Sequence, residues 1–258
     1  MLPYLSLGPF LLQTSGLALL IGVWIGLSLT EREAVRLQIR PNVVYNMVFL
    51  GLVGGIVGAR LAYVVRYLNA YLNNPISLFA LNPNTLSPVD GLLIGLIVAF
   101  IYGWLKGLSL RPTLDALAPG LAVFMVALGF SHLLSGDAFG SPSLVPWRIY
   151  LWNEYRHPAQ IYEILAALGV LFIVLKRPVG IPGEGINFLL VVALTAFSRI
   201  FLEAFRGDSV IWFGGFRVAQ IVALLVMAGS MWLMHTWARL EKRLAGRHQG
   251  DQPARSTS

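Results

Sequence analysis

Residues 156–175 read Arg-His-Pro-Ala-Gln-Ile-Tyr-Glu-Ile-Leu-Ala-Ala-Leu-Gly-Val-Leu-Phe-Ile-Val-Leu, a polar cluster that opens a long apolar segment. Pro158 suits the first position of a helix and His157 the cap before it, so the cluster predicts a helix N-terminus. Gln160 and Glu163 then share one face, which should not face lipid because an amide and a carboxylate are costly in hydrocarbon. The stretch therefore predicts a membrane helix with a polar face turned inward, opposite other buried polar groups.

The composition is that of a protein surrounded mostly by lipid. Of its 258 residues, 57% are apolar and 12% are charged, where soluble domains average about 25% charged. The chain has no cysteine, which removes disulfides, thiolate metal sites and a thiol nucleophile of its own, so any thiol chemistry must use a substrate thiol. The formal charge of +7 comes from basic residues at segment ends and in the tail, which favours anionic lipid headgroups over nucleic acid as partners.

Seven apolar segments approach the roughly 20 residues that a helix needs to cross the hydrocarbon. They lie at about residues 10–30, 43–66, 88–106, 114–134, 158–175, 186–205 and 212–237. The first has no basic region before it and no cleavage site after it, so it is predicted to be a retained helix and not a signal peptide. We therefore predict an all-α integral membrane protein, with a seven-helix transmembrane domain at 1–238 and a basic, disordered cytoplasmic tail at 239–258.

Basic residues between the segments predict the orientation of the chain. One side of the membrane receives twelve of them, Arg32, Arg36, Arg40, Lys106, Arg111, Lys176, Arg177, Arg239, Lys242, Arg243, Arg247 and Arg255. The other side receives three, Arg148, Arg156 and Arg206. Because loops rich in lysine and arginine stay in the cytoplasm, the C-terminus is predicted inside and the N-terminus outside.

This orientation brings polar residues of six predicted spans to the outer half of the membrane. In chain order they are Arg60, Tyr63, Asp90, His132, His157, Gln160, Glu163, Arg199, Glu203, Arg206, Arg217 and Gln220. The inner halves hold almost nothing comparable. Since ionisable groups inside a membrane mark functional sites, the sequence predicts one site near the outer leaflet.

Many of these residues fall into an ordered set of motifs. The motifs are Gly58-Ala59-Arg60 with Tyr63, Asp90-Gly91 with Gly95, Gly136-Asp137 with Gly140, His157-Pro158-x-Gln160-x-Tyr162-Glu163, Glu203 with Arg206, and Gln220. From about residue 8 to residue 235 they resemble the landmarks of bacterial prolipoprotein diacylglyceryl transferases. The resemblance implies seven helices in the bacterial cytoplasmic (inner) membrane with the N-terminus outside. It also implies transfer of a diacylglyceryl group from phosphatidylglycerol to the lipobox cysteine thiol of a prolipoprotein, with release of glycerol phosphate.

The motifs depart from the family pattern at five positions. Ser15 stands where the family has a tyrosine in its first helix, and Asp90 where it has a histidine. Gly129 and His132 replace the arginine and the asparagine of a Gly-Arg-x-x-Asn stretch, and Asp137 replaces the glutamate that follows. The scaffold residues of the family are thus kept while the centre is changed.

The implied chemistry needs a cation for the leaving phosphate, a base near the incoming thiol and an access route for two acyl chains. Arg60 and Arg206, with Tyr63 on the same helix as Arg60, are predicted to bind phosphatidylglycerol. Asp90 and His132 are the candidate catalytic bases. If the two side chains meet, the carboxylate would orient the imidazole.

Five further residues are predicted to support the site: His157, Gln160, Tyr162, Glu163 and Glu203. Arg199, Glu203 and Arg206 also share one helix face, so a purely structural ion-pair ladder is an alternative. Tyr63 and Tyr162 could equally be interfacial aromatics. No metal or other cofactor is expected, because the candidates lack the spacing of a metal site and no nucleotide loop is present.

Two other functions remain open. A related transferase would use the same lipid donor with a different acceptor, since the changed residues are those nearest the acceptor chemistry. A catalytically silent paralogue would keep the fold and bind lipid. The outer connection at 135–156 is either a plain surface loop or one that helps to admit a peptide.

Overall fold

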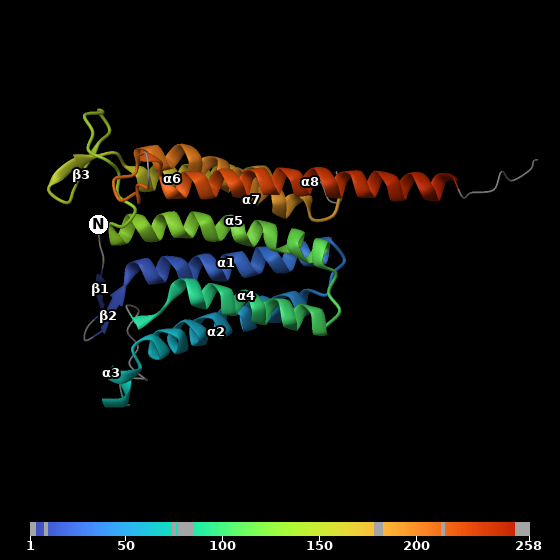
Figure 1. Ribbon diagram of the computed structural model, residues 1–258, viewed down its shortest axis with the longest axis horizontal. Coiled ribbons are helices and arrows are strands. Elements are labelled where there is room, and N and C mark those ends of the chain that lie inside the picture. Colours follow the sequence, from blue (N-terminus) through green and yellow to red (C-terminus); the bar gives the residue numbers. More distant parts are fainter. Residues whose placement is uncertain are drawn as a thin grey trace, which may run out of the picture. The chain divides into compact units, whose positions relative to one another are not determined.

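The computed structural model describes residues 4–7, 10–73, 76, 85–177, 183–212 and 215–250, which are mostly helical. The helices are α1 Thr14–Arg36, α2 Pro41–Arg66, α3 Leu68–Asn73, α4 Pro88–Leu105, α5 Leu110–Ser135, α6 Ala159–Lys176, α7 Ile186–Leu202, the short 3-10 helix η3 Glu203–Phe205, and α8 Val218–Gly250 (Figure 1). Within the described residues, seven helices are long and apolar enough to cross a membrane. The predicted all-α class and number of spans are confirmed.

Two short antiparallel hairpins accompany the helices. In the first, β1 Tyr4–Leu7 pairs with β2 Phe10–Gln13, and in the second, β3 Ile149–Leu151 pairs with β4 Glu154–Arg156. The predicted start of the first span at residue 10 is wrong, since residues 10–13 form a strand. A hydropathy window joins this apolar strand to the helix behind it, although the Gly-Pro pair at 8–9 is a turn signal.

The last span differs from its prediction at both ends. The helix begins at Val218, and before it Trp212 N–H donates to Phe216 O over 2.8 Å and Val218 N–H donates to Val210 O over 3.1 Å. The segment 239–250, predicted to be disordered, is helical, because it is rich in Ala, Leu, Glu, Lys and Arg, which favour helix without an apolar face. Residues 251–258 of the predicted tail lie outside the described residues.

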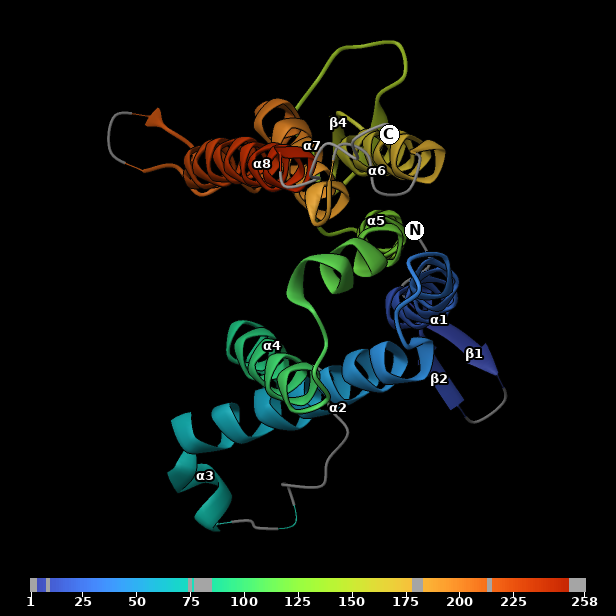
Figure 2. The ribbon, with the colours of Figure 1, turned by 90° about the vertical axis from the view of Figure 1, so that its right-hand side faces the viewer.

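The chain divides into two compact units. Unit 1 comprises Met1–Leu37 and Leu110–Ser258, and unit 2 comprises Gln38–Ser109. Unit 2 is built on the pairing of α2 with α4, which Figure 2 shows side by side. A Cβ atom at Gly91 or at Gly95 would lie 2.7 Å from the backbone oxygen of Gly55 or Gly51, respectively. Because such contacts leave no room for a side chain, these glycines set the close approach of the two helices.

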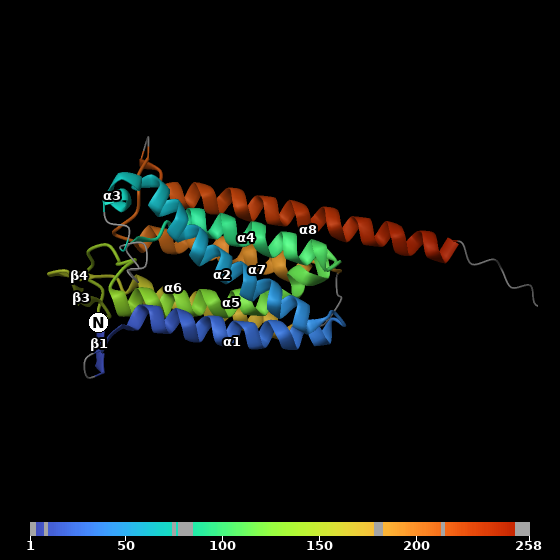
Figure 3. The same cartoon turned by 90° about the horizontal axis from the view of Figure 1, so that it is seen from below.

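Unit 1 packs α1, α6 and α7 against α5, and α8 against α7. Figure 3 shows α5 and α6 lying along one another. The buried core is formed by small and β-branched side chains, Ala118, Ala122, Val170, Val174 and Val191. Small residues let helix backbones approach closely. The resulting van der Waals packing holds the helices together in lipid, where the hydrophobic effect between helices is weak.

One end of unit 1 is fixed by a buried carboxylate. Asp115 of α5 is 4% exposed and accepts the backbone N–H groups of Gly185 over 2.6 Å and Phe188 over 3.0 Å. These donors belong to the start of α7, where backbone N–H groups have no partner within the helix. At the same end, Glu241 of α8 accepts the backbone N–H of Glu184 over 2.8 Å. This structural role of Asp115 was not predicted from the sequence.

Candidate functional site

The site forms at the opposite end of unit 1, where α5 and α7 end and α6 and α8 begin. Residues Gly140 and Arg206 form an antiparallel β-bridge, and Ser141 N–H donates to Phe205 O over 2.7 Å. Gln220 at the start of α8 donates to Ile200 O of α7 over 2.9 Å. These bonds join the connection after α5 to the end of α7, and α7 to α8.

The start of α6 differs slightly from its prediction. The helix begins at Ala159, with Pro158 before it and no capping side chain, so the prediction that His157 caps the helix is wrong. The backbone N–H of His157 donates to Ser141 O over 3.0 Å, which holds this residue in the loop pairing. Its ring lies edge-on against Phe205, at 5.2 Å between centroids.

The polar face of α6 is turned inward, as predicted. Gln160 is fully buried and donates from Nε2 to the backbone oxygen of Asp137 over 2.9 Å. The side chain of Glu163 is 20% exposed and lies between two partners from other helices. The face therefore points into the helix bundle and not into lipid.

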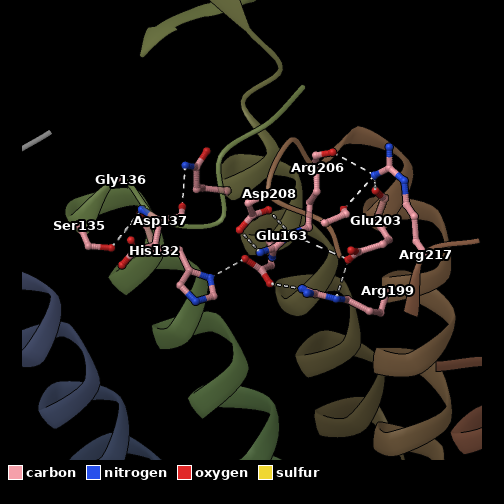
Figure 4. A network of polar contacts seen from close by, with 12 residues as sticks. His132, Ser135, Gly136, Asp137, Glu163, Arg199, Glu203, Arg206, Asp208 and Arg217 are labelled. Carbon is pink, nitrogen blue, oxygen red and sulfur yellow. Dashed lines mark hydrogen bonds and ion pairs between the residues drawn. The ribbon is translucent and has the colours of Figure 1, made fainter. Parts of the chain in front are cut away.

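Glu163 connects three helices of the bundle (Figure 4). Its Oε2 lies 2.8 Å from Nδ1 of His132 on α5, and its Oε1 lies 3.2 Å from Nη1 of Arg199 on α7. Nε of Arg199 lies 3.1 Å from Oε2 of Glu203, one turn further along the chain. From the sequence, a purely structural ion-pair ladder along α7 was an alternative. In the structure this ladder also contacts α6 and α5 through Glu163 and His132, so it is not confined to one helix.

Glu203 and Arg206 lie at the end of the same chain of contacts. Glu203 is 2% exposed and its Oε2 lies 3.9 Å from Nε of Arg206. The guanidinium of Arg206 makes two bonds to Asp208, of 2.9 and 2.6 Å. Arg217 donates to the backbone oxygen of Arg206 over 2.9 Å and so fixes this turn. We call the six side chains His132, Glu163, Arg199, Glu203, Arg206 and Asp208 the charged cluster.

Asp208 was not predicted, and Arg199 was predicted near the site without a role of its own. The available signals were an acidic residue two positions after Arg206 and the spacing of four and three residues between Arg199, Glu203 and Arg206. Neither signal identifies Glu163 as the partner of Arg199, because the two residues come from different helices.

The connection at 135–156 is held at the same end of the bundle. Tyr162 of α6 accepts a hydrogen bond from Nε1 of Trp147 over 2.6 Å, and its ring lies edge-on to Phe205 at 5.6 Å. Nε1 of Trp152 donates to the backbone oxygen of Gly136 over 3.2 Å. The loop is thus held by side-chain bonds at the site end of unit 1.

Two of the predicted lipid-binding residues lie in unit 2. Arg60 of α2 donates to the backbone oxygen and to the hydroxyl of Thr85, and its guanidinium lies 5.7 Å from the ring centroid of Tyr71. The ring of Tyr63 lies 4.6 Å from that of Tyr67. Both side chains therefore have neighbours within their own unit.

The two candidate bases have separate ion-pair partners. Asp90, in the first turn of α4 in unit 2, pairs with Arg66, with Oδ2 and Nη2 3.2 Å apart. His132, in unit 1, pairs with Glu163. Asp90 is therefore paired within unit 2, and His132 is paired within unit 1.

A cavity of about 440 Å³ opens between α5, α6, α7 and α8 of unit 1. Glu163 and Arg199 of the charged cluster line it, together with a mostly apolar set that includes Leu121, Met125, Leu128, Val170 and Val226. The volume is within the range of about 300–1,000 Å³ that small-ligand sites occupy. An apolar cavity with charged groups among its lining residues suits an amphiphile.

The described residues thus show seven helices of spanning length, and an apolar cavity beside the charged cluster, which together define a multi-span membrane protein with a candidate ligand site. Residues 3–236 match the family model described as prolipoprotein diacylglyceryl transferase. The chain belongs to this family, as its motifs indicated.

Similar curated proteins carry the same family name. A phosphatidylglycerol–prolipoprotein diacylglyceryl transferase of Halalkalibacterium halodurans is 28% identical over 268 residues, which cover 98% of this chain and 92% of the relative. The enzyme of that name from Trichormus variabilis is 27% identical over 250 residues and 88% of both chains. The one from Clostridioides difficile is 25% identical over 216 residues, 84% of this chain and 87% of the relative.

Proposed function

We propose that the protein transfers a diacylglyceryl group from phosphatidylglycerol to the lipobox cysteine thiol of a prolipoprotein, in the bacterial cytoplasmic membrane. The observation that carries the proposal is the apolar cavity lined also by Glu163 and Arg199, in a chain of this family. An acyl chain fits the apolar lining, and an anionic headgroup fits guanidinium groups. The chain's lack of cysteine agrees with a thiol brought by the acceptor.

The proposed reaction is a displacement at carbon. The acceptor thiol loses its proton to a base, and the thiolate sulfur bonds to the methylene carbon that carries the phosphate ester. The bond between this carbon and the phosphate oxygen breaks, and its electron pair leaves with the oxygen as glycerol phosphate. In unit 1, Arg206 would bind the phosphate and His132 is the candidate base; Arg60, Tyr63 and Asp90 of unit 2 stay predictions from the family resemblance.

A direct test incubates the purified protein with phosphatidylglycerol and a lipobox peptide, and follows the peptide by mass spectrometry. The proposed function requires a diacylglyceryl adduct on the peptide, and a peptide with serine in place of cysteine should remain unmodified. Absence of an adduct together with release of glycerol phosphate would indicate a different acceptor. Lipid binding without turnover would indicate a silent paralogue.

One observation favours the second candidate, a transferase with a different acceptor. Gly129 stands where the family motif has arginine, and a Cβ atom there would lie 2.8 Å from Cγ1 of Ile164. This close approach of α5 and α6 leaves no space for an arginine side chain. The acceptor side of the reaction therefore cannot use an arginine at this position, as the family pattern would.

We expect the orientation to follow the basic residues. The protein has no native cysteine, so Ser143→Cys and Ser109→Cys each introduce a single thiol. An impermeant thiol reagent added to intact cells should label the first variant, and should label the second only after the membrane is opened. The reverse pattern would place the charged cluster at the cytoplasmic side.

Phosphatidylglycerol binding should depend on Arg206. The Arg206 side chain is 13% exposed, and its guanidinium already makes two hydrogen bonds to the Asp208 carboxylate, a geometry that a phosphate can adopt in its place. We expect Arg206→Ala to weaken binding by about tenfold or more, as for hydrogen bonds to charged groups. Arg206→Lys should also bind weakly, because an ammonium group cannot make the bidentate contact of a planar guanidinium. Arg60→Ala should weaken binding as well.

If phosphate replaces the Asp208 carboxylate on Arg206, then removing that carboxylate should strengthen lipid binding. Asp208→Asn should strengthen phosphatidylglycerol binding by about two- to fivefold, since a partly exposed ion pair contributes about 1 kcal/mol or less. Arg148, exposed in the outer connection, gives the control Arg148→Ala, which should change affinity little. Titration of the five purified variants with phosphatidylglycerol measures the affinity of each. Equal affinities throughout would remove the phosphate role of Arg206 and Arg60.

A further inference from the structure

We infer that Glu163 is a positioning residue that holds the imidazole of His132 as the base for the acceptor thiol. The inference rests on the proposed function and names the group that prepares its proton transfer. It goes beyond the family resemblance, because His132 stands where the family motif has asparagine.

The contact between the two side chains sets the tautomer of the imidazole. Nδ1 of His132 lies 2.8 Å from Oε2 of Glu163. An ionised carboxylate only accepts hydrogen bonds, so Nδ1 carries the proton and Nε2 has the free lone pair. Among the described side chains and backbone groups, Nε2 has no hydrogen-bond partner. The nitrogen that can accept a proton is therefore available.

Arg199 holds the Glu163 carboxylate in place. Its Nη1 lies 3.2 Å from Oε1 of Glu163, the oxygen that His132 does not use. Arg199 is held in turn by Glu203, 3.1 Å from its Nε. The charged groups that face the imidazole are thus Glu163 of α6 directly and Arg199 of α7 through it, while Asp137 follows α5 itself and is exposed.

Two changes in the family pattern act together to make this contact. Gly129 packs on Ile164, with an added Cβ 2.8 Å from Cγ1 of that residue, so α5 and α6 lie close. His132 follows Gly129 by three residues, nearly one helical turn, and Glu163 directly precedes Ile164. The glycine lets the helices approach, and the histidine then meets the carboxylate.

The pair lies beside the proposed lipid site. Glu163 lines the cavity, and so does Leu128, which is one turn before His132 on α5. The side chain of His132 is 23% exposed. A thiol that approaches a lipid headgroup at this end of the cavity meets Nε2 without any rearrangement of Glu163.

The proton and electron pairs balance in this arrangement. Nε2 takes the proton of the thiol, and the resulting imidazolium is stabilised by the adjacent Glu163 carboxylate. The thiolate forms its bond to the glyceryl carbon, and the phosphate oxygen leaves with the electron pair of the broken bond. The imidazolium then returns its proton to the glycerol phosphate dianion, which restores His132 for the next turnover.

The test compares two lipobox peptides with each variant. One peptide carries cysteine and the other selenocysteine, whose selenol is already ionised at neutral pH and needs no base. With the cysteine peptide, His132→Asn should lower kcat by about 100-fold or more, as loss of a general base does. Glu163→Gln should lower kcat by at least about tenfold, because an amide does not fix the tautomer. With the selenocysteine peptide both losses should nearly vanish.

Controls and a second measurement separate this inference from the proposed function. His235→Asn and Glu184→Gln change side chains of the same kinds, exposed and outside the charged cluster, and should leave both rates unchanged. Equal losses with both peptides would overturn the inference and leave the transferase function standing. No adduct from the unsubstituted protein with either peptide would overturn the function itself.

The tautomer can be measured without relying on the activity of a variant. In protein labelled with ¹⁵N-histidine, the signals of His132 are identified by their loss in His132→Asn or His132→Gln. In the unsubstituted protein at neutral pH, they should show a protonated Nδ1 and an unprotonated Nε2. A protonated Nε2 with a bare Nδ1 would contradict the inference, whatever the kinetics.

Discussion

Replacement of Arg199 by alanine is expected to destabilise the protein and to stop diacylglyceryl transfer. The substitution removes a guanidinium that lies 3.2 Å from Glu163 and 3.1 Å from Glu203, of which Glu203 is 2% exposed. Removing one partner of a buried ion pair costs about 3–5 kcal/mol, and we expect about 2–3 kcal/mol here because part of the Arg199 side chain is exposed. Thermal unfolding in detergent and the rate of adduct formation measure the two effects.

The loss of activity should exceed what the loss of stability explains. Without Arg199, Oε1 of Glu163 loses the cation that contacts it, and the carboxylate orients His132 less well. Arg199→Lys keeps a charge but cannot contact both carboxylates with one planar group, so it should recover stability more than activity. Arg148→Ala, which removes an exposed arginine, should change neither. An Arg199→Ala protein with normal stability and rate would show that the charged cluster has neither role.

The second large effect is expected at Gly140. A Cβ atom there would overlap the backbone oxygen of His157 and lie 2.8 Å from its carbonyl carbon. Because both atoms belong to backbone, a side-chain rotation cannot relieve the clash. Gly140 also forms the β-bridge to Arg206, so Gly140→Ala must displace the end of α7 relative to α6. A displacement of about 1 Å at such a site can lower a rate by about 100-fold.

A matched glycine provides the control for this prediction. A Cβ atom at Gly169, in the middle of α6, would meet nothing within 4 Å. Gly169→Ala should therefore leave transfer unchanged and stabilise the helix slightly, by up to about 1 kcal/mol. If Gly140→Ala transfers the lipid as fast as Gly169→Ala, the close contact with His157 does not position the site.

The membrane spans were predictable because hydropathy is a local property. Each of the seven apolar segments became a helix, and most of the ends agree within a few residues. Errors arose where apolar residues serve another purpose, as in the strand Phe10–Gln13, or where a polar helix continues beyond the membrane, as in 239–250. A window of hydropathy cannot separate an apolar strand from an apolar helix, and it does not detect a helix that is mostly polar.

The site was predictable in its residues more than in its contacts. His132, Glu163, Glu203 and Arg206 were all named from the sequence, and the structure brings them together in unit 1. The partner proposed for His132 was Asp90, whereas its contact in the structure is Glu163. Spacing along one helix gives no information about which residue of another helix a side chain meets.

The sequence by itself determined the family, the number of spans and the inward polar face of α6, because motif order, hydropathy and the helical period are properties of the linear chain. Only the tertiary structure decided which charges meet. The contact between His132 and Glu163 depends on how closely α5 and α6 approach and on how each helix is rotated. That approach is set by the packing of Gly129 against Ile164. The contact of Glu163 with Arg199 likewise depends on the packing of α6 and α7, since the two residues are 36 positions apart.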